Sequence, residues 1–237
     1  MLSIMRPLLY TLSVIALTLL TASAQRSIRL LYHNAPAKDA LQELYLYGCN
    51  SDPLVPTKVK LRKQSFTRPI LLSAECSKVY LLTAPLPADA QEIPAGTTAI
   101  DTPINWNESL ALCFHSEKSS PLPLQIKTIN ASDDVFASGE IYWINLSKFP
   151  IKGSVGSQTI SLAPSKSRKI KAPTDESEYL ASIKYRVPSE DSPRTLIHQK
   201  WAATQSTKYV ALVLNKPKKN QAGYKVLPIR KFIRTKE

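Results

Sequence analysis

The sequence predicts an all-β protein made of two tandem antiparallel β-sandwich repeats, immunoglobulin-like in outline, which follow an N-terminal signal peptide. Three observations predict this fold class. Short runs of β-branched and aromatic residues recur at intervals of about ten residues, and hardly any stretch has the period of a helix. The chain has 18 Pro and 6 Gly, a balance that favours short strands joined by stiff connections. One strand motif also occurs twice.

Residues 1–24 have the pattern of a secretory signal peptide. Arg6 supplies a positive charge, Leu8 to Leu20 form an apolar run, and Ala22-Ser-Ala24 is a small-residue cleavage signal. The alternative is an uncleaved anchor, but the apolar run is shorter than the roughly 20 residues that a span needs. We therefore predict an exported chain that does not span a membrane and is periplasmic or extracellular. The signal peptide does not decide the host, for which we favour a bacterium over a eukaryote.

The repeated motif divides the remaining chain into two repeats, 25–121 and 122–237. Glu43-Leu-Tyr-Leu-Tyr-Gly48 precedes Glu140-Ile-Tyr-Trp-Ile-Asn-Leu146 by 97 positions. Matching elements in the same order indicate a duplication. Leu122 to Ile129 has two assignments: it is the last strand of the first repeat by order, or the first strand of the second repeat by spacing. The boundary consequently stays open between 117 and 134.

Each strand of the first repeat is predicted from its pattern and its flanking turns. Lys58-Val-Lys-Leu61 alternates charged and apolar residues, as a half-buried strand does. Ala74-Glu-Cys-Ser77 reads as the turn of a hairpin. The strands expected in this repeat are Ile28–Tyr32, Leu44–Tyr47, Lys58–Leu61, Pro69–Leu72, Val79–Leu82 and Leu110–Phe114.

The second repeat is predicted to follow the same order. Trp201 corresponds loosely to Trp106, and Tyr209–Leu214 takes the place of Leu110–Phe114. The strands expected in this repeat are Gln125–Asn130 if the spacing assignment holds, Ile141–Ile144, Thr159–Leu162, Arg168–Lys171, Tyr179–Tyr185, Tyr209–Leu214 and Tyr224–Ile233.

The three cysteines all lie in the first repeat. Cys49 and Cys76 both stand at predicted strand ends, so a Cys49–Cys76 disulfide is one hypothesis for an oxidising compartment. The alternative is that all three thiols are reduced. Cys113 alternates with apolar residues and is interpreted as a small buried side chain. The spacing of the cysteines and histidines does not match a zinc site, and we predict no bound metal.

The sequence favours a protein that is not an enzyme and needs no cofactor. His33, His115 and His198 are its only histidines, and no Gly-x-Ser-x-Gly or His-Glu-x-x-His motif accompanies them. The few glycines leave no phosphate-binding loop. The tryptophans Trp106, Trp143 and Trp201 have the rings that sugar binding uses, but strand neighbours favour a core role for Trp143.

Basic residues give the strongest indication of binding. Residues 25–119 hold 10 Lys and Arg against 9 Asp and Glu, whereas residues 120–237 hold 20 against 9. Such a surface attracts anionic partners. The predicted binding residues are Lys166, Arg168, Lys169, Lys171, Lys216, Lys218, Lys219, Arg230 and Lys231. The predicted partner is an anionic envelope or extracellular polymer or a partner protein, rather than nucleic acid; the plain alternative is a solvated face.

Two other functions are open. An exported, basic chain of two sandwich domains resembles the pilus chaperone family in outline, and Glu140 to Pro150 is similar to that family's strand before the interdomain region. The resemblance implies an assembly chaperone with an exposed edge strand for strand addition. The strand lies late in this chain, however, and the family's ordered N-terminal Arg and central Lys have no counterparts that can be placed. A hydrolase on a β scaffold would need a cleft that unites His198 with a nucleophile.

Overall fold

The computed structural model describes residues 25–33, 43–48, 55–117, 119, 122–173, 177–217 and 220–229. These residues form strands, turns and loops and no helix, so the described chain contains no helix that is long and apolar enough to cross a membrane. The predicted signal peptide lies outside the described residues and stays a prediction.

The first half folds into a sandwich of two four-stranded sheets. Its inner sheet has the order β4-β1-β7-β8 and its outer sheet the order β3-β2-β5-β6. The strands are β1 (Arg26–His33), β2 (Glu43–Gly48), β3 (Thr57–Lys60), β4 (Ile70–Leu72), β5 (Lys78–Leu82), β6 (Thr98–Asp101), β7 (Glu108–His115) and β8 (Leu124–Asn130).

The second half repeats this arrangement. Its inner sheet has the order β12-β9-β15-β16 and its outer sheet the order β11-β10-β13-β14. The strands are β9 (Glu140–Asn145), β10 (Ile151–Val155), β11 (Gln158–Leu162), β12 (Ser167–Lys171), β13 (Glu178–Tyr185), β14 (Arg194–Ala202), β15 (Lys208–Asn215) and β16 (Ala222–Ile229).

The prediction of an all-β fold with two tandem sandwiches is confirmed. Counted from the first strand of each half, both halves have the strand orders 4-1-7-8 and 3-2-5-6. Each inner sheet also contains one parallel pair, β1 with β7 and β9 with β15, among otherwise antiparallel pairs. The strand patterns did not indicate this parallel pair, because its two partners lie at opposite ends of each half.

The predicted alignment of the repeated motif is wrong. Glu43–Gly48 is β2 of the first outer sheet, whereas Glu140–Asn145 is β9 of the second inner sheet, whose counterpart by strand order is β1. The two motifs resemble each other because both strands alternate aromatic and aliphatic residues. Likewise Trp106 lies in the turn before β7, whereas Trp201 lies within β14. The correspondence of β7 with β15 agrees with the predicted order.

The strand with two open assignments pairs with the first half. β8 lies antiparallel to β7, from Ser109 opposite Asn130 to His115 opposite Leu124. It is therefore an edge of the first inner sheet, and the strand pairing favours a boundary in 131–139 rather than at 121/122.

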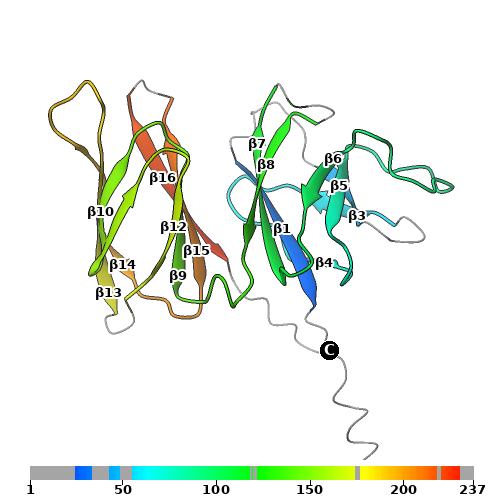
Figure 1. Cartoon of the computed structure of the whole chain (residues 1–237), viewed down its shortest axis with the longest axis horizontal. Coiled ribbons are helices and arrows are strands. Elements are labelled where there is room, and N and C mark those ends of the chain that lie inside the picture. The colour runs from blue at the N-terminus through cyan, green and yellow to red at the C-terminus, as the bar shows by residue number, and fades with distance from the viewer. Residues whose placement is uncertain are drawn as a thin grey trace, which may run out of the picture.

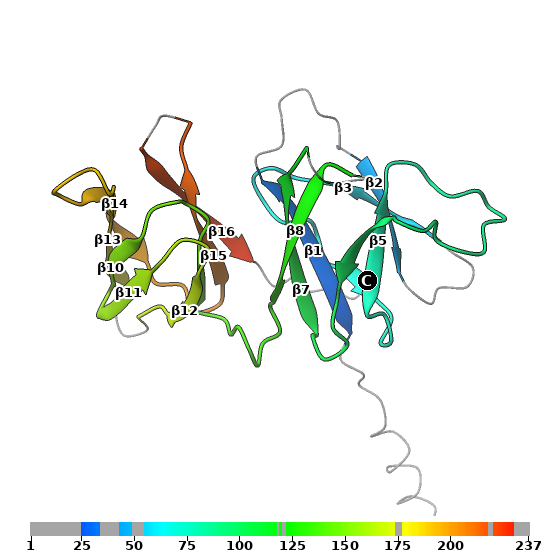
Figure 2. The ribbon, with the colours of Figure 1, turned by 45° about the horizontal axis from the view of Figure 1, so that its top comes forward.

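The two sandwiches pack through their inner sheets. One apolar core fills the first sandwich and another the second. A third core joins residues of both inner sheets, so each inner sheet is buried on both faces, and Figures 1 and 2 show the four sheets as successive layers. This core contains Leu31, Leu110, Leu112 and Ile129 from the first sandwich, Phe136 from the connection, and Ile144, Val210, Leu212, Leu227 and Ile229 from the second.

A buried lysine adds polar contacts to this interface. Lys208 of β15 is only 3% exposed, and its ammonium lies 2.8 Å from Asp133 and 3.5 Å from Glu108. It also donates a hydrogen bond to the carbonyl oxygen of Ala131. Glu108 in turn pairs with Arg29 at 2.8 Å. A buried charge is tolerated only with such partners, so this network favours one relative placement of the two sandwiches.

Candidate binding groove in the second sandwich

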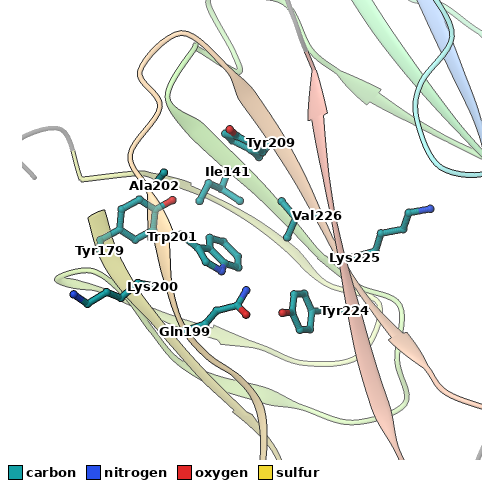
Figure 3. A pocket seen from close by; sticks show the side chains of 10 residues that line it. All are labelled: Ile141, Tyr179, Gln199, Lys200, Trp201, Ala202, Tyr209, Tyr224, Lys225 and Val226. Carbon is teal, nitrogen blue, oxygen red and sulfur yellow. The ribbon is translucent and has the colours of Figure 1, made fainter. Parts of the chain in front are cut away.

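A cavity lies along the open side of the second sandwich, between the edge strands β14 and β16. Its volume is about 580 Å³. The side chains around it are shown in Figure 3. They are Ile141, Tyr179, Gln199, Lys200, Trp201, Ala202, Tyr209, Tyr224, Lys225 and Val226.

Strand alternation puts the aromatic side chains in this groove. Side chains on a strand point to opposite faces in turn, so Gln199 and Trp201 of β14 face the groove while their neighbours face outward. Tyr224 and Val226 of β16 face it from the other sheet. Because β14 and β16 are the last strands of their sheets, no further strand of the described chain covers these side chains.

The core holds the Trp201 ring in place. Trp201 stacks on Trp143 with the ring centroids 5.9 Å apart and an interplanar angle of 5°, and Trp143 is fully buried. The edge-to-face contact with Tyr179 has a centroid distance of 6.3 Å. Stacked and edge-to-face pairs of this kind stabilise a fixed ring geometry. The indole is therefore a preformed platform with one partly open face.

The Tyr179 phenol at the groove keeps its proton. Burial, and then the charge of Tyr209, raises the pKa of Tyr179 to about 12. The hydroxyl of Tyr209 lies 2.6 Å from the hydroxyl of Thr204. With the Gln199 amide, these groups offer uncharged donors and acceptors beside aromatic faces.

The two lysines at the groove point away from its centre. Figure 3 shows Lys200 and Lys225 leaving the aromatic cluster in opposite directions. The Lys225 ammonium donates a 2.6 Å hydrogen bond to the carbonyl oxygen of Lys63 in the first sandwich, and burial lowers its pKa. The groove can therefore stack a flat or ring-shaped uncharged surface and hydrogen-bond its rim, while charge lies outside it.

Among the described residues, the basic residues predicted from the sequence lie on or beside β12 and just after β15. Lys166 precedes β12, and Arg168, Lys169 and Lys171 lie on it, at the opposite edge of the second inner sheet from β16. Lys169 is used internally, because its ammonium lies 3.2 Å from Glu140 and donates to the carbonyl oxygen of Val135.

Of the remaining predicted basic residues, the structure describes Lys216. The stem of Lys216 lies against Gly223, where an added Cβ would come within 2.9 Å of it. Lys218, Lys219, Arg230 and Lys231 lie outside the described residues.

The predicted disulfide also stays a prediction, because Cys49 lies outside the described residues. The Cys76 sulfur lies 3.1 Å from the carbonyl oxygen of Lys78 and near Gly48, where an added Cβ would be 3.6 Å from it. Cys113 is buried as expected, and burial raises the pKa of its thiol to about 12.

The three histidines have different surroundings. His198 has its Nδ1 3.3 Å from the Ser182 hydroxyl on an exposed sheet face, and in the part of the chain that the structure describes no carboxylate pairs with it. His115 Nδ1 lies 3.3 Å from the Tyr32 hydroxyl. His33 is buried against Phe114. The described residues contain no group of three His, Cys, Asp or Glu that could hold a metal ion.

Comparison with known proteins assigns no family: neither a protein-family model nor a curated protein sequence matches the chain. The sequence does not indicate the groove, although Trp201 is one of the three tryptophans whose rings suit sugar binding. The alternation of Gln199 with Trp201 and of Tyr224 with Val226 was visible, but nothing in the sequence indicates that β14 and β16 lie side by side.

Proposed function

We propose that the chain is an exported, non-catalytic binding protein whose second sandwich holds a polysaccharide chain in the groove between β14 and β16. The observation that carries the proposal is the convergence of four aromatic side chains, Tyr179, Trp201, Tyr209 and Tyr224, on one open cavity. Aromatic faces with a few neutral hydrogen-bonding groups suit the apolar faces and hydroxyl rims of sugar rings.

The edge strands favour a polysaccharide over an added peptide strand. β16 contains Pro228, which has no amide hydrogen to offer a new strand, and the pairing of β13 with β14 shifts register between Ile183 and Lys184. Proline and bulges at sheet edges both oppose strand addition. The assembly-chaperone alternative would need one of these edges to accept a strand.

Intrinsic tryptophan fluorescence tests the proposal, because Trp201 is the half-buried indole in the groove. Titration with soluble polysaccharides, both neutral dextran and acidic polygalacturonate, should give a saturable change with at least one of them, and Trp201→Phe should remove the signal. Tyr224→Ala should weaken binding by about tenfold, as expected for the loss of about 1.4 kcal/mol of contact.

The matched control is Tyr80→Ala, which removes a half-buried ring from the outer sheet of the first sandwich. It should leave the affinity unchanged. Equal affinities for the wild type and Tyr224→Ala, or no response to any polysaccharide, would contradict the proposed function. Saturable binding of an extended peptide with no response to polysaccharide would instead support the chaperone alternative.

A further inference from the structure

The outward face of the second outer sheet carries basic residues that do not belong to the set predicted from the sequence. On β10 and β13, Lys152 and Lys184 are direct cross-strand partners, and both are exposed. Arg186 follows two residues later on the same face, and its amide donates a 3.1 Å hydrogen bond to the carbonyl oxygen of Pro150. Side chains of direct partners start about 5 Å apart, so these three cationic groups are neighbours.

Hydroxyl groups extend this basic cluster into rows across the sheet. Ser161 of β11 is opposite Lys152, and Thr195 of β14 is opposite Lys184. The two-residue turn at Gly156, which has a φ of 57°, joins β10 to β11 and fixes the first of these registers. The next row contains only hydroxyl groups and an imidazole: Thr159, Ser154, Ser182 and His198.

Acidic groups do not neutralise this cluster. Within the ranges that the structure describes, no carboxylate forms an ion pair with Lys152, Lys184 or Arg186. Glu190, on the loop that follows β13, is instead held by two hydrogen bonds of 2.5 and 2.6 Å from Arg194. Like charges directly opposite each other destabilise a sheet. The free protein therefore carries an unfavourable Lys–Lys pair that a bound anion would relieve.

A shallow cavity of about 390 Å³ lies at the cluster. Lys152, Ser161, Lys184 and Arg186 line it together with Pro150 and Pro193. A planar guanidinium, two ammonium groups and a hydroxyl are suitable donors for a carboxylate or sulfate. The cluster therefore combines a concave surface, excess positive charge and hydrogen-bond donors.

We infer that this face binds the carboxylate or sulfate groups of an acidic polysaccharide. The inference rests on the proposed function for the nature of the chain, and it adds that the chain is anionic. β14 connects the two sites, because Trp201 and Gln199 face the groove while His198 and Lys200 face the same way as the cluster. A chain seated in the groove can thus continue over β14 onto the donor-rich face.

The test compares two double variants that remove equal charge from the second sandwich. Lys152→Gln with Lys184→Gln changes the cluster. Lys166→Gln with Lys171→Gln changes exposed residues at β12 that belong to the set predicted from the sequence, so the comparison decides between the two surfaces. Retention on immobilised polygalacturonate and on immobilised dextran sulfate is measured in a sodium chloride gradient, since salt screens such contacts. The cluster variant should bind at least about tenfold more weakly, and the β12 variant should stay close to wild type.

Retention on the first polymer alone would identify carboxylate as the recognised group, and retention on the second alone would identify sulfate. Equal losses in both double variants would show diffuse attraction by net charge and would overturn the inference, as would binding to anionic lipid vesicles alone. A stability readout guards against misfolding: polygalacturonate should raise the melting temperature of wild type and the β12 variant more than that of the cluster variant.

The two experiments together distinguish a failure of the anion site from a failure of the groove. If Tyr224→Ala weakens polysaccharide binding while the cluster variant is retained like wild type, the groove stands and the anion site fails. If the cluster variant loses retention while Tyr224→Ala binds normally, the anion site stands and the groove fails.

Discussion

The outer sheets of the two sandwiches have the same strand order but differ in which charged side chains face each other across the strands. On the first outer sheet, Glu43 lies between two lysines: it pairs with Lys58 at 2.7 Å and is the cross-strand partner of Lys60. Lys78 likewise lies 3.8 Å from Asp101. On the second outer sheet, Lys200 lies 3.7 Å from Glu178, but Lys152 directly faces Lys184.

The second half differs from the first in how its basic residues are arranged as well as in how many it has. Opposite charges across a strand pair stabilise a sheet, and like charges do the reverse. The first outer sheet follows the stabilising pattern. The second departs from it at the place where a cavity opens, which is where a binding role would offset the loss.

The open sides of the sandwiches differ in a related way. In the first sandwich, β8 contributes Leu124 to the core and Ile126 to its margin. In the second, β16 contributes Ala222 to the core and leaves Tyr224 36% exposed beside Trp201. The same topological edge thus carries aliphatic side chains in one sandwich and an exposed aromatic side chain in the other.

The largest expected effect would come from a cation that the first sandwich uses structurally. Arg26 is buried and donates six hydrogen bonds to carbonyl oxygens, among them those of Cys76 at 2.7 Å and Thr102 at 2.6 Å. Arg26→Ala should lower the free energy of unfolding by about 3 kcal/mol or more, because buried acceptors lose their partner. Urea unfolding measures this, with exposed Arg68→Ala as the control; similar values for both variants would contradict a structural role for Arg26.

A pH effect of smaller size should separate the buried histidine from the exposed one. His33 is 6% exposed, and burial, then the charge of Lys225, lowers its pKa from the ordinary value of 6.5. Above pH 6.5 the ring is neutral in both states. As the pH falls below 6.5, the unfolded chain gains the proton first, so stability should fall.

Urea unfolding between pH 7.5 and pH 5.5 tests this expectation. His33→Phe should flatten the fall in stability, whereas His198→Gln should leave it unchanged because His198 is exposed. An unaltered pH profile in His33→Phe would show that other groups cause the fall.

The smallest effect has the opposite sign from that of Arg26. Lys184→Gln removes one member of the facing lysine pair, so it should raise the free energy of unfolding by about 0.5 kcal/mol. Lys58→Gln, which breaks the ion pair with Glu43, should lower it slightly or leave it unchanged. Thermal unfolding in low salt compares the two variants. Destabilisation by Lys184→Gln would show that the facing lysine pair does not destabilise the sheet.

Much of the fold could be predicted from local patterns. Alternation along Tyr179–Tyr185 and the turns between short strands were enough to predict sandwiches. The alignment of the repeats could not be predicted in this way, because β2 and β9 share composition although they occupy different sheets. The apolar runs Leu110–Phe114 and Tyr209–Leu214 carry the signature of strands buried on both faces, which explains the packing of the inner sheets only once the pairing is known.

The candidate sites depend on contacts between distant segments. Lys152 and Lys184 are separated along the chain, and only the pairing of β10 with β13 makes them neighbours. Trp201 and Tyr224 meet because two edge strands of different sheets end on one side of the sandwich. The sequence indicated that the second half is basic and that Trp201 could bind a sugar ring, but it did not indicate which side chains lie beside these residues.

Lysine footprinting tests the central claim most directly, because one experiment on the unaltered chain compares both outer sheets. Exposed lysines are acetylated with and without polygalacturonate, and the modified positions are quantified by mass spectrometry. We expect the polymer to protect Lys152 and Lys184 and to leave Lys58 and Lys60 as reactive as in the free protein. Equal protection of both pairs, or protection of Lys58 and Lys60 alone, would contradict it.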